Sequence, residues 1–256
     1  MNGFELEIEF LGTGTSSGIP EIGCSCPVCI SQDACDKRMR TSAVVRYQGK
    51  NLLIDCGPDF RSQMLRSSST RLDALMVTHI HYDHVGGMDD LRAYCHEGTF
   101  PVYARPDLID DLHKHMPYCF ADKLYPGVPL LELHEIGETP FVAAGVEVVP
   151  IPVMHGSRPI VGFKIGPLAY ITDAKTIDDS VIDSLLGIKL LVINALRIAP
   201  HHSHLELDKS LEIVTRINPE KAFFIHMSHG MGLHKEMNKK LPDNVRLAHD
   251  GLIVRV

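Results

Sequence analysis

Three histidines and one aspartate lie within six residues, directly after an apolar segment typical of a buried strand. The cluster reads His79-Ile80-His81-Tyr82-Asp83-His84, and the segment before it covers residues 72–78. Residues two apart in an extended chain point to the same side, so His79 and His81 can bind one ion. A turn after them can bring Asp83 and His84 toward a second ion. Because imidazoles and carboxylates suit zinc, iron or manganese, the cluster predicts a site for two divalent metals.

Three further polar residues follow apolar, strand-like segments in the same way. His155 comes after Val-Glu-Val-Val-Pro-Ile-Pro-Val-Met, Asp173 after Leu-Ala-Tyr-Ile-Thr, and His226 after Lys-Ala-Phe-Phe-Ile. A single histidine in such a place is more often structural than a ligand, and a surface loop without function is the alternative interpretation of the cluster. Four placements of this kind in one chain favour a shared metal site.

A second group of candidate ligands lies near the start of the chain. Cys24-Ser25-Cys26-Pro27-Val28-Cys29 places three thiols in a C-x-C-x-x-C pattern. The chain has seven cysteines, an odd number, and its first residues lack the features of a signal peptide, so we expect reduced thiols and a structural zinc site. Cys35 and His229 are both candidates for a fourth ligand. Unpaired, packed cysteines are the alternative.

The net charge and the hydropathy argue against nucleic-acid-binding and membrane-spanning classes of protein. A net charge of −7 over 256 residues argues against nucleic acid or an anionic membrane as a partner of the whole surface. No apolar run approaches the ~18 residues that a membrane span needs. With 45% hydrophobic and 22% charged residues, the composition is that of a globular protein, and we expect a cytoplasmic one.

The hydrophobic pattern predicts strands that first come in groups and later alternate with helices. Residues 5–10 alternate charged and apolar side chains, which predicts a half-exposed strand, and Gly86-Gly87 would let the chain turn tightly after the histidine cluster. Further strands are expected over 42–47, 51–56, 72–78, 101–104, 142–153 with a kink at Gly145, 161–172, 190–196, 221–227 and 245–256. Helices are expected from 88, within 107–126, over 176–187 with Thr176 as N-cap, over 205–217 and over 233–241. This order predicts one α/β domain, residues 1–256, with layered sheets and outer helices.

The pattern Thr-His-x-His-x-Asp-His, with the later histidines and aspartate, resembles the metallo-β-lactamase superfamily over nearly the whole chain. The resemblance implies an αββα sandwich with its metals at one edge of the sheets. It also implies that His79, His81 and His155 hold one ion, that Asp83, His84 and His226 hold the other, and that Asp173 bridges them and takes part in catalysis. Asp55 would order the metal loop without binding metal, and Asp250 would be structural.

Within that superfamily, the early cysteines and the late His-x-x-His pattern resemble the PhnP-type phosphodiesterases. This resemblance implies that His229 completes the structural zinc site with Cys24, Cys26 and Cys29, and that Cys35 is free. It also implies that His204 donates a proton during catalysis, for which a pKa near neutrality would suit it. A solvated loop is the alternative for His204 and its neighbours. Similar phosphodiesterases are dimers, so a homodimer is a further expectation.

The expected activity is hydrolysis of a small phosphodiester, such as a cyclic ribose or nucleotide phosphate. Two zinc or manganese ions, about 3.5–4 Å apart, would activate a bridging water. Alternatives within the superfamily are a tRNA 3′-processing endonuclease, which the acidic net charge disfavours, and a thioester hydrolase, which the cysteine motif disfavours. A non-catalytic role would require a broken ligand set, and no ligand position is missing.

Three features near the expected site have two interpretations each. Residues 105–127 carry Tyr118, Phe120 and Tyr125, which could form a lid or a local packing cluster. Arg158 could contact a phosphate, although a lone arginine is usually a surface residue. Thr13 and Ser16, in a glycine-rich loop, could do the same, but the loop lacks the lysine of a P-loop.

Overall fold

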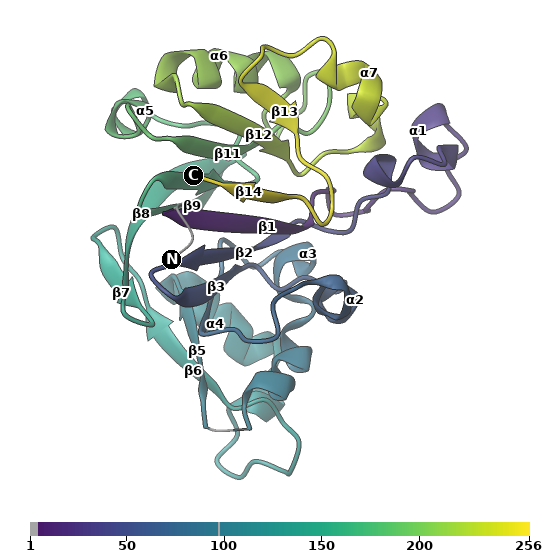
Figure 1. Ribbon diagram of the computed structural model, residues 1–256. Coiled ribbons are helices and arrows are strands. Elements are labelled where there is room, and N and C mark those ends of the chain that lie inside the picture. Colours follow the sequence, from purple (N-terminus) through teal and green to yellow (C-terminus); the bar gives the residue numbers. More distant parts are fainter. Residues whose placement is uncertain (1–4, 97) are drawn as a thin grey trace.

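Two mixed β-sheets lie face to face in the computed structural model, which describes residues 5–96 and 98–256 (Figure 1). In strand order, the first sheet contains β14 (Ile253–Arg255), β1 (Leu6–Gly12), β2 (Ser42–Tyr47), β3 (Lys50–Ile54), β4 (Ala74–Met76), β5 (Phe100–Ala104) and β6 (Leu131–Glu135). The second contains β13 (Val245–Leu247), β12 (Lys221–Ile225), β11 (Leu190–Asn194), β10 (Leu168–Ile171), β9 (Arg158–Ile165), β8 (Val146–His155) and β7 (Phe141–Ala143). The first sheet combines strands from the first part of the chain with the final strand, β14. The second sheet consists of consecutive strands, β7 to β13.

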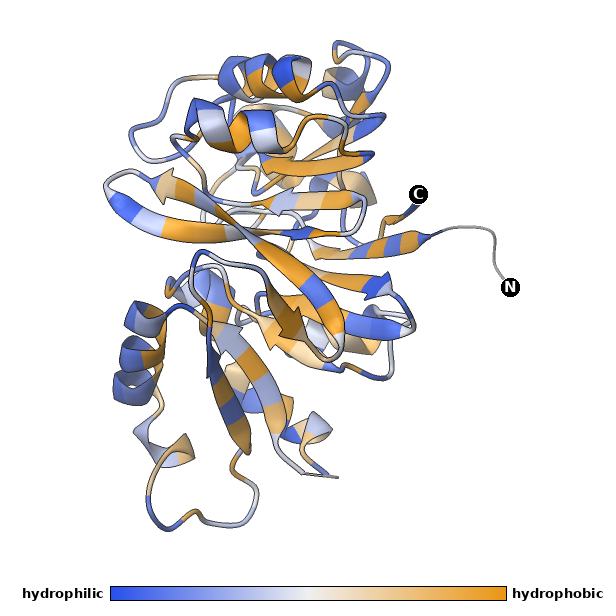
Figure 2. Ribbon diagram, turned by 90° about the vertical axis from the view of Figure 1, so that its left-hand side faces the viewer, coloured by the Kyte–Doolittle hydropathy of each residue, from blue (hydrophilic) through white to orange (hydrophobic). Residues whose placement is uncertain are grey.

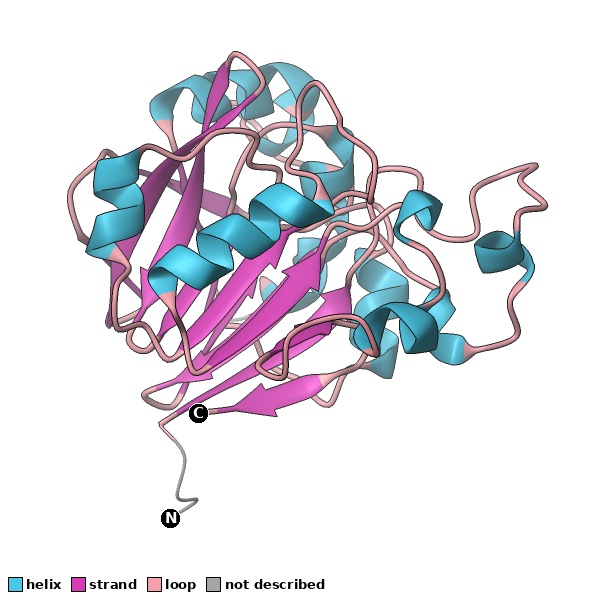
Figure 3. Ribbon diagram, turned by 90° about the horizontal axis from the view of Figure 1, so that it is seen from above, coloured by secondary structure: helices cyan, strands magenta, loops and turns pink. Residues whose placement is uncertain are grey.

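Helices cover the outer face of each sheet. The helices α2 (Phe60–Arg66), α3 (Tyr82–Val85) and α4 (Pro106–His115) lie by the first sheet, and α5 (Asp179–Ser184), α6 (Leu207–Ile217) and α7 (His234–Asn238) lie by the second (Figures 1 and 3). The short helix α1 (Pro27–Ile30) belongs to a segment that projects from the sandwich, and short 3₁₀ helices cover Ala34–Asp36, Met88–Tyr94, Pro117–Cys119 and His229–Met231. None of the helices in the described ranges is long and apolar enough to cross a membrane.

Three apolar layers hold this arrangement together, and hydropathy colouring shows apolar strands between helices with polar outer faces (Figure 2). The middle layer, between the sheets, includes Ile8, Met76 and Val192. A second layer packs α5–α7 on the second sheet, and a third packs α2 and α4 on the first sheet. Each fully buried aliphatic side chain contributes about 1.5–3 kcal/mol. The predicted αββα sandwich is confirmed.

The first strand shows how alternation sets the faces of a sheet. Leu6, Ile8 and Phe10 point into the layer between the sheets and are fully buried. The prediction of a half-exposed strand is wrong for Glu9, which is also buried. Its carboxylate is paired with Arg46 and accepts a hydrogen bond from Ser67 Oγ at 2.9 Å, so its charge is compensated.

The predicted final strand over 245–256 is wrong, because the chain changes sheets within it. Residues 245–247 pair in parallel with β12, whereas 253–255 pair antiparallel with β1 in the other sheet. Between them, the left-handed Gly251 (φ 82°) turns the chain, and its amide donates to the Phe10 carbonyl at 2.7 Å. Local alternation cannot reveal a change of partner, since both halves are strand-like.

Smaller differences from the sequence predictions have local causes. The helical spacing after residue 88 forms a 3₁₀ helix rather than an α-helix. Thr176 is not a helix N-cap, because its backbone bridges to Met154, and α5 begins after Asp178. The strand expected over 142–153 turns at Gly145, where a kink was expected, and the strand expected over 161–172 is divided by a tight turn at Gly166.

The chain turns at Gly86 and Gly87 into the 3₁₀ helix that follows, as predicted, but with ordinary negative φ angles of −64° and −102°. Glycine is needed at this turn for close packing. A Cβ atom on Gly87 would lie 2.1 Å from the Gly57 carbonyl oxygen, and one on Gly57 would lie 2.0 Å from the Asp83 carbonyl oxygen. These contacts press the segment after the histidine cluster against the segment after β3.

We expect Gly87→Ala to lower the free energy of unfolding by about 1–3 kcal/mol, because the new methyl group must push two backbone segments apart. Urea titration followed by circular dichroism measures this change. Gly137→Ala is the matched control, since a Cβ there meets no atom within 4 Å, and it should stay within about 0.5 kcal/mol of the parent. Equal midpoints for both variants would contradict the packing argument.

Candidate metal centre

The predicted metal-site residues all lie at strand ends on one edge of the sandwich. The histidine cluster follows β4 and runs into α3, and His155 is the last residue of β8. Asp173 lies two residues beyond β10, and His226 directly follows β12. The strands β10, β11 and β12 are mutually parallel, so their carboxyl ends share an edge. The sequence pattern of polar residues after apolar strands therefore corresponds to one place in the fold.

Three of the residues at this edge have left-handed backbone conformations. Asp55, Asp173 and His226 have φ angles of 60°, 57° and 54°. Such angles are uncommon for residues other than glycine and cost about 1–3 kcal/mol each where the surroundings impose them. Each one ends a buried strand with a sharp change of direction, which turns its side chain toward the common centre.

The first group of donors consists of His79, His81, His155 and Asp173, whose nitrogen and oxygen atoms lie within 4.8 Å of one another. His79 Nε2 is 3.1 Å from His81 Nδ1 and 3.7 Å from Asp173 Oδ2. His155 Nδ1 donates to the Ser203 carbonyl oxygen at 2.8 Å, which leaves its Nε2 available as a ligand. Three imidazoles and a carboxylate in this arrangement fit one divalent ion.

The second group consists of Asp83, His84, His226 and the same Asp173, and all four are buried. His84 Nε2 is 3.2 Å from Asp83 Oδ2 and 3.5 Å from Asp173 Oδ1, and His226 Nδ1 is 3.1 Å from Asp173 Oδ1. One carboxylate oxygen of Asp173 thus faces each donor group. The structure brings together all seven residues that the resemblance implied, with Asp173 between the two groups.

Two buried nitrogen atoms without hydrogen bonds indicate whether the two donor groups are built to bind metal ions. His84 Nε2 and His226 Nδ1 are inaccessible to solvent and have no hydrogen-bond partner. Such atoms cost about 1–3 kcal/mol unless something compensates them. Both face the carboxylate of Asp173, so a cation bound there would satisfy them and the carboxylate together. The residues present therefore fit a divalent metal.

Electrostatics within the centre separate the histidines into two kinds. Burial opposes protonation of His84, but the carboxylates of Asp173, Asp83 and Asp55 outweigh it and raise its pKa well above the usual value. Burial, with the charge of His84, lowers the pKa of His79 well below the usual value. Burial alone would raise the pKa of Asp173, but the imidazoles of His226 and His84 hold it well below its usual range. Asp173 is therefore an anion.

Supporting residues behind the donors fix their orientation. Asp55 accepts hydrogen bonds from the Thr78 amide at 2.8 Å and from His84 Nδ1 at 2.6 Å, and it lies outside both donor groups. This placement fits the predicted role of ordering the metal loop. Two threonines also support the centre without having been given a role from the sequence: Thr78, which belongs to the histidine motif, and Thr15, whose hydroxyl is 3.2 Å from His226 Nε2.

Asn194 is another supporting residue that the sequence analysis missed. Its side chain makes two hydrogen bonds with the backbone of Ala174, one to the amide at 2.8 Å and one to the carbonyl at 3.0 Å. This pairing anchors the segment that carries Asp173. Asn194 is buried and ends the apolar strand β11, so the signal that identified the other residues could have found it.

His204 lies beside the two donor groups. Its ring is 4.5 Å from that of His155 and 5.0 Å from that of His226, and its Nδ1 is 4.0 Å from Asp173 Oδ2. Burial, followed by the charge of His226, lowers the pKa of His204 to about 3. The expectation of a pKa near neutrality is therefore wrong. Its role as a proton donor stays a prediction.

The glycine-rich loop after β1 is a structural support. Thr13 is buried, donates to Asp250 Oδ1 at 2.8 Å and accepts from Arg38 Nη1 at 2.7 Å, so the idea that it contacts phosphate is wrong. Asp250 also accepts from the Met39 amide at 2.7 Å. These contacts agree with a structural role for Asp250. They tie the loop to the crossing between β13 and β14.

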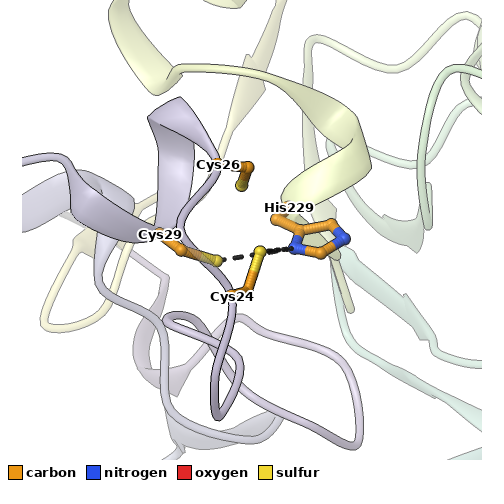
Figure 4. A group of neighbouring side chains, drawn as sticks. All are labelled: Cys24, Cys26, Cys29 and His229. Atoms are coloured by element: carbon orange, nitrogen blue, oxygen red, sulfur yellow. Dashed lines mark hydrogen bonds between the residues drawn. The ribbon is translucent and has the colours of Figure 1, made fainter.

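The three cysteines of the C-x-C-x-x-C motif, in the projecting segment, lie close to His229. Donor atoms of Cys24, Cys26, Cys29 and His229 lie within 4.8 Å of one another, and the side chains converge (Figure 4). His229 Nδ1 is 3.3 Å from Cys24 Sγ and 3.4 Å from Cys29 Sγ. Burial raises the pKa of the Cys29 thiol to about 11, a cost that a bound cation would offset. Cys35 is not part of this group.

The start of α4 borders the metal centre. Arg105, Leu108 and Arg158 line a recess of about 10 Å³ beside His79, large enough for one water molecule. Of the aromatic residues that follow, Tyr118 and Phe120 pack on the helical layer of the first sheet, whereas Tyr125 is 59% exposed. Local packing therefore accounts for two of the three aromatic residues that could have formed a lid.

The raised pKa of His84 predicts that metal binding releases a proton. Without metal, His84 stays protonated through neutral pH, so an ion must displace about one proton, and the apparent affinity should rise with pH. Calorimetric titration with Mn²⁺, which avoids thiolates, in two buffers of different ionisation enthalpy measures this release. Equal heats in both buffers would show that His84 is already neutral.

Comparisons with known proteins agree with this geometry. The chain matches a protein family described as the beta-lactamase superfamily domain over residues 50–227. A crystal structure described as a new diphosphatase from the PhnP family has a TM-score of 0.92 and 37% identity, covering 98% of this chain and 97% of that one. Zinc-bound PqqB from Methylobacterium extorquens has a TM-score of 0.79 at 18% identity, covering 98% of this chain and 100% of that one, which shows a shared fold.

A curated relative carries a different name. An octanoyltransferase from Porphyromonas gingivalis is 43% identical over 94% of this chain, but the match covers only 50% of that protein. The chain thus spans about half the length of this relative. The family match covers most of the chain, and the sandwich carries the candidate ligands at the edge that the motifs predicted. The chain therefore belongs to the metallo-β-lactamase superfamily.

Proposed function

We propose that the protein is a dinuclear metal-dependent phosphodiesterase. The observation that carries the proposal is that two groups of donors share one carboxylate, Asp173, and leave buried nitrogen atoms of His84 and His226 without a hydrogen bond. Two divalent ions held there would supply Lewis acidity and lower the pKa of a water molecule. Zinc or manganese suits the donor set. A further zinc ion in the Cys24, Cys26, Cys29 and His229 group would be structural.

The residues of the chain supply orientation and proton transfer. Asp173 is an anion between the two donor groups, so it can accept a hydrogen bond from the attacking water and orient it. His204 lies beside Asp173, with its Nδ1 4.0 Å from Asp173 Oδ2. Its pKa of about 3 means that the imidazole is neutral before substrate binds. A negatively charged phosphoryl group next to it would raise this pKa and let His204 protonate the leaving alkoxide.

Phosphorus is favoured over other reaction centres by the likeness to the PhnP-family diphosphatase, which is 37% identical over nearly both whole chains. A diphosphate linkage is the second candidate substrate, because that relative is named for it. In both linkages a substituted phosphorus lies between an attacking and a leaving oxygen. The same two ions would therefore stabilise the charge that develops in either reaction. We propose a small phosphodiester, with a cyclic ribose or nucleotide phosphate as the first choice.

Acyl transfer is the competing activity, because of the octanoyltransferase relative. The match covers half of that protein, so we assign octanoyl transfer to the half that has no counterpart here. Cleavage of tRNA is a third possibility, and the net charge of −7 speaks against it. We further propose that residues 1–256 form one domain, which the shared layer between the sheets supports, and that the protein acts as a homodimer.

A panel of substrates separates these activities. With added Mn²⁺ or Zn²⁺, we expect turnover of bis-p-nitrophenyl phosphate, 2′,3′-cyclic nucleotides or a ribosyl 1,2-cyclic phosphate, measured by product release. A dinucleoside diphosphate tests the second candidate. An octanoyl thioester, a precursor tRNA and a phosphomonoester serve as the contrasting substrates. Turnover of the thioester or the tRNA alone would refute the proposed function.

Asp173→Asn should lower kcat/KM on the best diester by about three orders of magnitude, since several kcal/mol of charge stabilisation are lost at the shared carboxylate. Asparagine keeps the shape, so the circular dichroism spectrum should not change. Asp178→Asn, an exposed position outside the centre, is the control for loss of one charge. If Asp173→Asn keeps more than about a tenth of the activity, the dinuclear mechanism is wrong.

A further inference from the structure

We propose that His201 is a positioning residue that holds the Ser203 backbone, and through it both the metal ligand His155 and the catalytic candidate His204. His201 belongs to neither donor group. The proposal concerns the metal centre and does not depend on the substrate. Its catalytic consequence rests on the proposed function.

The side chain of His201 closes a local turn with Ser203. His201 Nδ1 lies 3.3 Å from the Ser203 amide nitrogen, which donates to it, and 3.3 Å from the Ser203 hydroxyl. A side-chain acceptor bonded to the amide two residues on is the geometry of an Asx turn, here made by an imidazole. This requires Nδ1 to be unprotonated, and burial lowers the pKa of His201, which favours the neutral ring.

The turn is connected to a metal ligand. The Ser203 carbonyl oxygen accepts from His155 Nδ1 at 2.8 Å, which fixes the tautomer and the ring orientation of His155. The two segments also lie close together, since a Cβ on Gly156 would lie 3.5 Å from Ser203 Cβ. Displacement of the turn would therefore remove the hydrogen bond that directs His155 Nε2 toward the first donor group.

The turn is also connected to His204. This residue follows Ser203, and its ring lies between those of His155 and His226 at 4.5 and 5.0 Å. Its Nδ1 is buried and has no hydrogen-bond partner, so no hydrogen bond of this atom holds the ring in place. The backbone on both sides of His204 therefore sets its position: the turn at Ser203 before it, and the Leu205 amide after it, which donates to the Ala174 carbonyl at 2.7 Å. The rings of His201 and His204 also lie 5.2 Å apart, which adds packing to the hydrogen bonds of the turn.

Three substitutions at one position test the role of the acceptor. His201→Asn places an oxygen where Nδ1 lies and can form an Asx turn, so it should behave like the parent. His201→Gln places its polar atoms one bond farther out, and His201→Ala removes them. His202→Ala is the matched control. This neighbouring histidine is exposed, and the interaction that the structure describes for it is a ring contact with His201.

The first measurement is Mn²⁺ binding, followed by the loss of the free-ion signal in electron paramagnetic resonance. His201→Ala and His201→Gln should each weaken one of two Mn²⁺ ions by about tenfold and leave the other unchanged. His201→Asn and His202→Ala should bind both ions as the parent does. Unchanged binding in His201→Ala would overturn the proposal. If that variant fails to fold, equal binding by His201→Asn and His201→Gln would overturn it instead.

The second measurement compares leaving groups. His201→Ala should lower kcat about tenfold more for a 2′,3′-cyclic nucleotide, which loses a poor alkoxide leaving group, than for bis-p-nitrophenyl phosphate, and leave KM nearly constant. Equal losses on both substrates would remove the link to His204. If the parent enzyme hydrolyses no diester, the proposed function fails, but the Mn²⁺ measurement still decides the role of His201.

Discussion

The buried carboxylate of Asp173 faces His79, His84 and His226 at 3.7, 3.5 and 3.1 Å, shielded from bulk solvent. A buried carboxylate is costly unless cations or hydrogen bonds compensate it. The compensation must come from segments more than fifty residues away in the sequence, so the ends of β4, β10 and β12 have to meet at one point. The face-to-face sheets make this possible, because both present strand ends at the same edge.

Backbone strain and unsatisfied polar atoms at that edge lower the stability of the fold. Three residues with φ angles of 54° to 60° and three buried nitrogen atoms without hydrogen bonds lie there, and each costs about 1–3 kcal/mol. The apolar layers on both sides of each sheet supply the stability that offsets these costs. Rigid strands then hold the donors in place before any ligand arrives, which is what a centre for charge stabilisation requires.

Much of this centre could be predicted from the sequence, because its residues follow buried strands. His155, Asp173 and His226 each stand directly after or near the end of an apolar run, and parallel strands bring such ends together. The rest depends on contacts that no local pattern encodes. The pKa of His204 reflects burial by distant residues, and the Ser203 carbonyl acts through its backbone, which any residue has. The change of sheets between residues 247 and 253 is a choice of partner, not of conformation.

That change of sheets also orders the events of folding. Residues 253–255 complete the first sheet by pairing with residues 7–9, the largest separation along the chain of any strand pair described. Because synthesis runs from the amino end, residues 253–255 emerge long after β1, and one side of β1 stays open until they do. Its amide and carbonyl groups are a template for pairing with other chains during that time.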